Sequence, residues 1–351
     1  MNRIVLDCER MKYPDTGLFS YCLHLGLHLK LASYSKTKQI SFYLPKQVKG
    51  IFGDSEYIVQ HSVQKFLLPS LKNKDIWHCT YQSSHYVPQL NKKIKVVLTI
   101  HDLNFLYDQT QSESKKQKNL RQLQKNIDRS NVIVCISEFC KNDVLQNCEV
   151  GNKPVIVIYN GTNILQPASL TVNSYKPTSR FLFSIGVVNR KKNFHVLLPL
   201  LQQNKDMELL IAGKRDDENY IQYINHSAQE LGVQEKVRVL GAISEYEKSW
   251  YYNNCYAFTF PSLAEGFGLP VAEAMSLGKP LFLSDRTALP EIGQDVAFYF
   301  DDFNAQKMQE VFRNGMYQYK KKNMEPLIRE RGNQFCWQKA AKEYLEIYHT
   351  I

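Results

Sequence analysis

Two glutamates flank a glycine-rich segment in the second half of the chain. Glu265 and Glu273 have seven residues between them, and that gap holds two glycines and a proline (EGFGLPVAE). A glycine loop that runs into a helix N-terminus leaves backbone N–H groups unpaired and presents the positive end of the helix dipole. Glycine also lets the backbone approach a ligand closely. The pattern therefore predicts an anion-binding site with a carboxylate at each end.

The apolar, proline and glycine residues around this segment predict its secondary structure. The apolar run 257–260 predicts a strand, and the loop follows it. Pro270 is suited to open a helix, where its fixed φ and missing N–H do no harm. Gly278 is suited to close that helix as its C′ residue. The predicted order is strand, glycine loop and short helix.

A histidine stands at the end of another predicted strand. His101 follows the apolar residues 96–100 and precedes Asp102. Ligands collect at the carboxyl ends of strands in open α/β sheets. A lone histidine is also commonly structural, so the residues alone leave both interpretations open.

Composition indicates a globular chain of two domains. The 351 residues contain 44% hydrophobic and 22% charged residues, without a run of eighteen apolar residues. The first residues have the pattern of a strand rather than the layout of a signal peptide. The eight cysteines form no C-x-x-C pair, which favours free thiols in a reducing compartment. We therefore expect a cytoplasmic protein.

Charge is distributed unevenly along the chain. Residues 1–175 hold 22 Lys/Arg against 13 Asp/Glu, a net charge of +9, whereas residues 176–351 hold 22 against 21, or +1. One interpretation is a solvated lysine-rich surface, and the other is a face that meets anionic lipid or an acidic polymer. A nucleic-acid partner is not expected, since no RNA- or DNA-binding signature accompanies the charge.

Strand-like and helix-like segments alternate throughout, which predicts an α/β fold with mostly parallel sheets. Helices are expected from Gly17, after the capping box of Ser244 and Glu247, and over the amphipathic tail from Trp337. The expected strands are 3–7, 40–44, 76–80, 94–100, 131–136, 154–158, 180–185, 208–212, 237–240, 257–260, 280–284 and 297–300. The predicted domains are 1–168 and 180–335, with a linker at 169–179 and a final helix within 336–351.

Taken together, these motifs resemble glycosyltransferase family 4, retaining enzymes with two facing Rossmann-like domains (the GT-B fold). The segment from Glu265 to Glu273 matches the family signature, and 288–293 (ALPEIG) follows its usual continuation. Residues 184–193 (SIGVVNRKKN) resemble the loop that holds the donor diphosphate. The resemblance covers nearly the whole chain and is strongest to bacterial enzymes of lipopolysaccharide, O-antigen and capsule synthesis, many of them mannosyltransferases.

The resemblance implies a role for each matching residue. It places Glu265, His101 and Lys192 at the reacting sugar and Glu273 at the nucleotide ribose. It places the backbone of Gly266, Phe267 and Gly268 on sugar hydroxyls, and the Leu269 end of the helix at the diphosphate. The remaining donor-binding positions that it implies are Gly17, Gly186, Arg190, Lys191, Gly213 and Leu240.

The chain departs from the family pattern at two positions. Val187 stands where many members have an arginine, which leaves open whether Arg190 or Lys191 supplies the second cation. Gly17 is single where many relatives carry two glycines. We expect no metal, because no Asp-x-Asp motif occurs in a matching context and a helix N-terminus with a lysine can stabilise the leaving phosphate.

The function predicted from the sequence is retaining transfer of a hexose, with mannose favoured, from a GDP- or UDP-linked donor. No cofactor is expected beyond this donor. The expected acceptor is a growing, lipid-linked bacterial surface glycan, so we expect the protein to be cytoplasmic and peripheral on the anionic inner membrane. The resemblance also implies that the final helix returns to the first domain. Two alternatives remain: another GT-B enzyme, such as a sugar phosphorylase or nucleotide-sugar epimerase, and a non-catalytic partner subunit.

Overall fold

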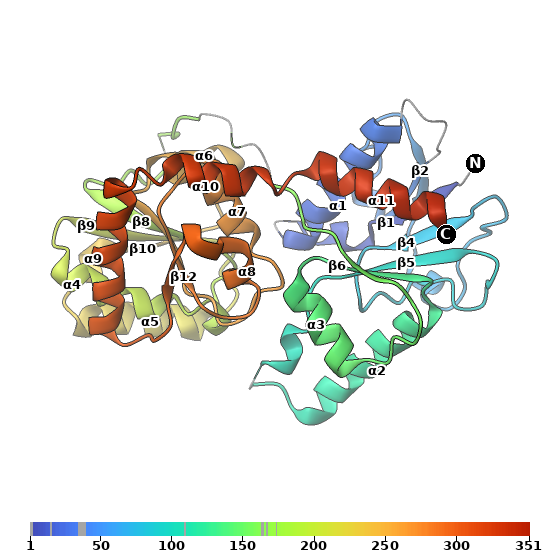
Figure 1. The fold of residues 1–351 in the computed structure, drawn as a ribbon, viewed down its shortest axis with the longest axis horizontal. Coiled ribbons are helices and arrows are strands. Elements are labelled where there is room, and N and C mark those ends of the chain that lie inside the picture. Colours follow the sequence, from blue (N-terminus) through green and yellow to red (C-terminus); the bar gives the residue numbers. More distant parts are fainter. Residues whose placement is uncertain are drawn as a thin grey trace. The chain divides into compact units, whose positions relative to one another are not determined.

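A computed structural model describes residues 3–14, 16–33, 40–108, 110–162, 165, 168–172 and 174–351. The chain divides into two compact units (Figure 1). Unit 1 comprises residues 1–161 and 336–351, and unit 2 comprises residues 162–335. No helix in the described ranges is long and apolar enough to cross a membrane.

Unit 1 is built on a parallel sheet with the strand order β3-β2-β1-β4-β5-β6-β7. The chain winds from β1 to β3 in one direction and from β4 to β7 in the other, so the winding reverses between β1 and β4. The elements of this unit are β1 (Ile4–Asp7), α1 (Gly17–Ser33), β2 (Ile40–Leu44), β3 (Glu56–Val59), β4 (Ile76–Cys79), β5 (Lys95–Ile100), α2 (Glu113–Arg129), β6 (Val132–Cys135), α3 (Glu138–Asn147), β7 (Val155–Val157) and α11 (Trp337–Thr350).

Unit 2 repeats the arrangement with a parallel sheet in the order β10-β9-β8-β11-β12-β13. Here the winding reverses between β8 and β11. The elements of this unit are β8 (Arg180–Ile185), α4 (Leu200–Gln203), β9 (Met207–Ala212), α5 (Glu218–Glu230), β10 (Val237–Gly241), α6 (Glu245–Asn254), β11 (Ala257–Phe260), α7 (Leu269–Ser276), β12 (Leu281–Ser284), α8 (Leu289–Gly293), β13 (Phe298–Phe300), α9 (Ala305–Lys321) and α10 (Glu325–Asn333).

The α/β class and the parallel sheets predicted from the sequence are confirmed. The predicted capping box is present, because Ser244 accepts from the N–H of Glu247 while the Glu247 carboxylate accepts from the N–H of Ser244. Gly278 lies just beyond α7 with a φ of 65°, as a helix-closing glycine should. One strand was not predicted, β3, which is four residues long and only partly buried.

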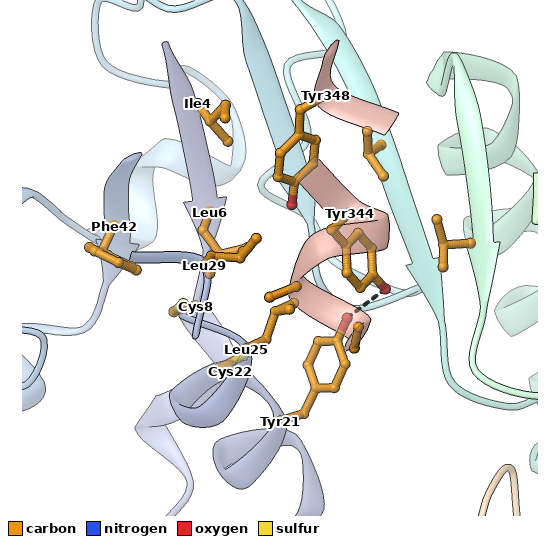
Figure 2. Close-up of a cluster of buried hydrophobic side chains, with 14 of the residues drawn as sticks. Ile4, Leu6, Cys8, Tyr21, Cys22, Leu25, Leu29, Phe42, Tyr344 and Tyr348 are labelled. Atoms are coloured by element: carbon orange, nitrogen blue, oxygen red, sulfur yellow. Dashed lines mark hydrogen bonds between the residues drawn. The ribbon is translucent and has the colours of Figure 1, made fainter. Parts of the chain in front are cut away.

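The final helix packs into the core of unit 1. Tyr344 and Tyr348 of α11 are buried in one apolar cluster with Tyr21 and Leu25 of α1 and Leu6 of β1. Figure 2 shows the hydroxyl groups of Tyr21 and Tyr344 meeting, at 2.8 Å. A side chain at Gly161 would bring a Cβ within 2.2 Å of the Trp337 nitrogen, so the chain leaves unit 1 directly beside the point where it returns.

The boundary between the units falls earlier than we predicted. We placed the end of the first domain at residue 168 and a linker at 169–179, whereas unit 2 begins at Thr162. The reason is that Thr162 donates from its N–H and its hydroxyl to the carbonyl of Phe335, both at 3.0 Å. In addition, the carboxylate of Glu208 accepts from the N–H groups of Thr178 and Ser179, at 2.8 and 3.0 Å. Residue 173 of the predicted linker lies outside the described residues.

Candidate active site

The loops after β8 and β11 meet at the point where the winding of unit 2 reverses. In an open parallel sheet this point leaves a crevice at the carboxyl ends of the two strands, where ligands bind. The loop after β8 contains Lys191 and Lys192, and the loop after β11 contains Ser262 and Leu263. The N–H of Leu263 donates to the carbonyl of Lys191 at 2.9 Å, which fixes the two loops against each other.

A buried ion pair joins these loops. The ammonium of Lys192 donates to Glu265 Oε1 at 2.5 Å, and the two side chains are only 11% and 13% exposed. The hydroxyl of Ser262 donates to the same oxygen, and the N–H of Glu265 donates to Thr287 Oγ1 at 2.8 Å. Two predicted residues 73 positions apart in the sequence are thus brought into contact.

The ion pair keeps Glu265 ionised. Burial alone would raise the pKa of its carboxyl, but the charges of Lys192 and Lys191 hold this pKa below its ordinary value of 4.5. Lys191 is exposed, yet its charge acts on the same carboxylate of Glu265. The site presents a fixed negative charge beside two cations.

The lowered pKa predicts a pH-dependent contribution to stability. A carboxyl that is more acidic in the fold stabilises it fully above the unfolded-state pKa and ceases to do so as the pH falls through the folded-state pKa. The difference in Tm between wild type and Glu265→Gln should be constant from about pH 6 to 8 and shrink below about pH 4.5. Glu310→Gln, at an exposed position of α9, is the control. A difference that stays constant down to pH 3 would contradict this prediction.

The second glutamate of the pattern is held by a different helix. Glu273 lies in α7, and its carboxylate accepts from Lys248 at 3.1 Å and from the hydroxyl of Tyr252 at 3.0 Å, both in α6. The side chains of Lys248 and Glu273 are 12% and 10% exposed. Burial would lower the pKa of Lys248, but Glu273 and Glu245 raise it above the ordinary value, so this lysine remains charged.

Sequence reasoning missed Lys248 and Tyr252. Their spacing of four residues places them on one face of α6, which was a detectable signal. Nothing in the sequence linked that face to Glu273, which lies 25 residues beyond Lys248.

Three glycines line the carboxyl ends of neighbouring strands in unit 2. Gly186, Gly213 and Gly241 follow or end β8, β9 and β10, and their φ values are 156°, 133° and 77°. A Cβ at Gly213 would lie 1.9 Å from the carbonyl oxygen of Gly186, so this position requires glycine. The backbone here forms a floor without side chains. Leu240, which we predicted as a donor contact, is partly buried within β10, immediately before Gly241.

The glycine loop between the two glutamates enters α7 as predicted. Gly268 is the N-cap residue with a φ of 102°, and Leu269 begins the helix. A Cβ at Gly268 would lie 2.9 Å from a methyl group of Leu289. Gly266 is buried, and the ring of Phe267 is only 3% exposed and packs edge-on against Phe335. The backbone of 266–268, rather than the Phe267 ring, is therefore the part suited to contact a ligand.

Arg190 and Lys191 differ in their surroundings. The guanidinium of Arg190 lies 5.3 Å from the ring centre of Tyr223 and 5.8 Å from that of Tyr220, both in α5. The charge of Lys191 acts on Glu265 instead. Of these two basic residues, Lys191 is the one whose charge bears on the ion pair.

The remaining two predicted residues belong to unit 1. His101 follows β5, is 8% exposed, and donates from Nε2 to the carbonyl of Thr80 at 2.8 Å. Because a carbonyl only accepts, Nε2 carries the proton and Nδ1 is left as an acceptor. Burial lowers the pKa of His101, which favours the neutral ring. Its ring contacts Tyr21 edge-on, with centroids 4.6 Å apart.

Gly17 begins α1, and a Cβ built there would meet no atom within 4 Å. Its backbone therefore borders open space, unlike that of Gly213. Among the residues that the structure describes, no group of three or more His, Cys, Asp or Glu side chains could hold a metal ion.

Two family models match the chain, one on each unit. Residues 51–164 match the model for Glycosyltransferase Family 4, and residues 170–324 match the model for Glycosyl transferases group 1. The chain is 23% identical over 261 residues to an O-antigen chain mannosyltransferase of Salmonella typhimurium, covering 74% of this chain and 69% of that one. It is also 23% identical to O-antigen chain mannosyltransferase B of Escherichia coli, covering 85% and 86%.

Solved structures share the fold at low identity. Anabaena HepE in complex with UDP-glucose superposes with a TM-score of 0.78 at 16% identity over all of both chains. Sucrose-phosphate synthase from Thermosynechococcus elongatus gives 0.78 at 17% identity, over 99% and 98% of the chains. With two parallel-sheet units of this kind and a family match on each, the chain is a GT-B glycosyltransferase whose first unit belongs to Glycosyltransferase Family 4 and whose second unit belongs to Glycosyl transferases group 1.

Proposed function

We propose that this glycosyltransferase moves a hexose, with mannose favoured, from a GDP- or UDP-linked donor to a growing, lipid-linked bacterial surface glycan. We further propose that it does so with retention of configuration and without a metal. The observation that carries the proposal is the buried pair of Lys192 and Glu265 at the reversal point of unit 2. The preference for mannose is supported by the two O-antigen mannosyltransferases among its relatives.

The donor would extend along the segment between the two glutamates. In this proposal Glu265 and the backbone of 266–268 contact the sugar, and Glu273 contacts the ribose. The diphosphate lies at the N-terminus of α7, near Leu269, over the floor formed by Gly186 and Gly213. The absence of side chains from that floor supports the placement, because a bulky diphosphate needs close approach to the backbone.

Fixed cations would take the role that a metal has in other transferases. Cleavage of the bond between the anomeric carbon and the phosphate oxygen adds a negative charge to the departing diphosphate, which pre-positioned positive groups stabilise. Lys192 is already oriented by Glu265, and we assign Lys191 as the second cation because its charge reaches the same carboxylate. Arg190, stacked over Tyr223, is the less suited of the two.

Unit 1 would supply His101 and the acceptor. The neutral ring of His101 offers Nδ1 to a sugar hydroxyl, since Nε2 is engaged by Thr80. The open space at Gly17 allows a substrate to approach the start of α1. The retaining outcome and the lipid-linked acceptor rest on the family resemblance. The net charge of +9 on residues 1–175 supports an acceptor presented at an anionic leaflet, with the protein peripheral on the cytoplasmic side.

The test begins with thermal unfolding in the presence of GDP, UDP and ADP. A nucleotide at a hundredfold its Kd should add about 2.7 kcal/mol to the free energy of unfolding, and we expect GDP to have the largest effect. The second step is transfer from GDP-mannose to a lipid-linked glycan acceptor, with NMR of the anomeric proton of the product. We expect retention and a rate that is unchanged by EDTA.

Each other result would point to an alternative. A requirement for inorganic phosphate would indicate a phosphorylase, and nucleotide release without any acceptor would indicate an epimerase. Nucleotide binding without turnover on any tested acceptor would favour a non-catalytic subunit. If none of the nucleotides stabilises the protein, the proposal that unit 2 holds the donor site is wrong.

A further inference from the structure

Unit 1 carries a protruding apolar surface that the proposed catalytic site does not use. Its four side chains, here called the apolar rim, are Val63, Phe66, Leu67 and Leu90, which are 70%, 87%, 72% and 86% exposed. They come from two loops, one after β3 and one before β5, which together line a cavity of about 470 Å³. Large apolar side chains gathered in this way mark an interaction surface.

The backbone beneath the apolar rim is held firmly. Arg129, a buried arginine of α2, donates to the carbonyls of Pro88, Asn91 and Ile94 at 2.6–2.7 Å and so fixes the loop that carries Leu90. On the other loop the amide oxygen of Gln64 accepts from the N–H of His61 and from the hydroxyl of Tyr43, both at 2.8 Å. The apolar side chains are thus displayed by a fixed scaffold.

The charge around the apolar rim is mostly positive. Residues 57–101 contain six lysines and one acidic residue, Asp75, whose carboxylate accepts from the backbone N–H of Arg3. Lys74 is paired with Glu56, whereas Lys65, Lys72 and Lys93 are exposed and line the same cavity.

The positive field continues onto α2. Lys118, Arg121 and Lys125 line a second cavity, of about 350 Å³, together with His85. The pKa of His85 is lowered by partial burial and by the charges of Lys65, Lys125 and Lys118. Lys65, which borders the apolar rim, and Lys118 of α2 both act on His85, so basic residues extend from the loop after β3 to α2.

We propose that the apolar rim docks unit 1 on an anionic lipid bilayer, with Phe66, Leu67 and Leu90 entering the interface and the surrounding lysines facing the headgroups. Apolar side chains flanked mainly by cations complement a bilayer whose interior is apolar and whose surface is negative. A protein partner would need a carboxylate opposite each of these lysines, whereas an anionic bilayer offers negatively charged phosphates as a continuous surface. The inference rests on the proposed lipid-linked acceptor and adds the part of the chain that meets the membrane.

The test measures binding to vesicles of phosphatidylglycerol and phosphatidylcholine by co-sedimentation. The triple variant Phe66→Ser/Leu67→Ser/Leu90→Ser should weaken binding by about thirtyfold or more, because three large apolar side chains lose their burial. In a second variant, Lys65→Gln/Lys72→Gln/Lys93→Gln, each lost charge should weaken binding about fivefold on anionic vesicles. Val172→Ser/Leu327→Ser removes exposed apolar side chains from unit 2 and should leave binding unchanged.

A single reporter adds direct evidence of insertion. Compared with the wild type and its three tryptophans, Phe66→Trp should show an additional blue-shifted emission with anionic vesicles and additional quenching by a lipid-borne quencher. Unchanged vesicle binding in both triple variants would overturn the proposal. So would a self-association in solution that the first variant abolishes, since the apolar rim would then cover a second copy of the chain. Stabilisation by GDP and transfer to a short water-soluble acceptor should be unaffected in these variants, which separates this inference from the proposed function.

Discussion

Lys192→Ala should lower transfer from the nucleotide-sugar donor by about 10²–10³-fold, the loss typical of removing one pre-positioned group that stabilises developing charge. It should also lower the free energy of unfolding by about 3–5 kcal/mol, since Glu265 is left buried without its cation. Steady-state kinetics and denaturant unfolding measure the two effects separately.

A double variant distinguishes catalysis from folding. Lys192→Ala/Glu265→Gln removes the uncompensated carboxylate, so most of the stability should return while activity stays low. Lys307→Ala is the control, because the ion pair of Lys307 with Asp302 lies on the surface of unit 2, with side chains 60% and 44% exposed. If the turnover of Lys192→Ala stays within a few-fold of that of the wild type, this lysine has no catalytic role.

Lys248→Met should leave Glu273 buried without this ammonium and with the Tyr252 hydroxyl as a hydrogen-bond donor from α6, and we expect a loss of about 3–5 kcal/mol of stability. If Glu273 holds the ribose, the KM for the donor should rise about tenfold or more while kcat changes little, because a ribose contact is the same in ground and transition states. Calorimetry and donor titration at saturating acceptor measure these effects.

The matched control for this variant is Lys279→Met. The ammonium of Lys279 donates to the carbonyl of Asn253 at 2.6 Å, so its removal strands no buried carboxylate and should cost only about 1 kcal/mol. Lys248→Met/Glu273→Gln should recover stability but not donor affinity. A rise in KM that Lys279→Met reproduces would mean that Lys248 acts through general stability of unit 2.

Much of the fold could be predicted because local patterns and global topology agree. Continuous apolar runs such as 257–260 are typical of strands buried on both faces of a parallel sheet. The strand β3 escaped prediction because Glu56–Val59 is short and only partly buried, so its pattern is weak. The domain boundary was misplaced because residues 174–179 are bonded to unit 2 through the carboxylates of Glu208 and Glu247, which lie far along the chain.

The candidate site could be predicted where it lies within one continuous motif. The glycine loop and Gly278 follow from backbone requirements that a sequence displays directly. The contact of Lys192 with Glu265 joins two loops through the sheet topology, and only the family resemblance linked them beforehand. For Lys248 the sequence showed only a helix face shared with Tyr252 and no link to Glu273, because Glu273 lies on another helix.

The return of α11 to unit 1 has a consequence for synthesis of the chain. Tyr344 and Tyr348, with other apolar residues of α11, complete a core whose remaining members lie in the first 161 residues, yet the 174 residues of unit 2 are translated between them. At 5–20 residues per second the ribosome needs roughly 9–35 s for that stretch. During this interval Tyr21 and Leu25 lack their partners on α11, whereas unit 2 is a continuous segment that can close first. The core of the first unit therefore stays incomplete until synthesis of unit 2 has ended and α11 has been made.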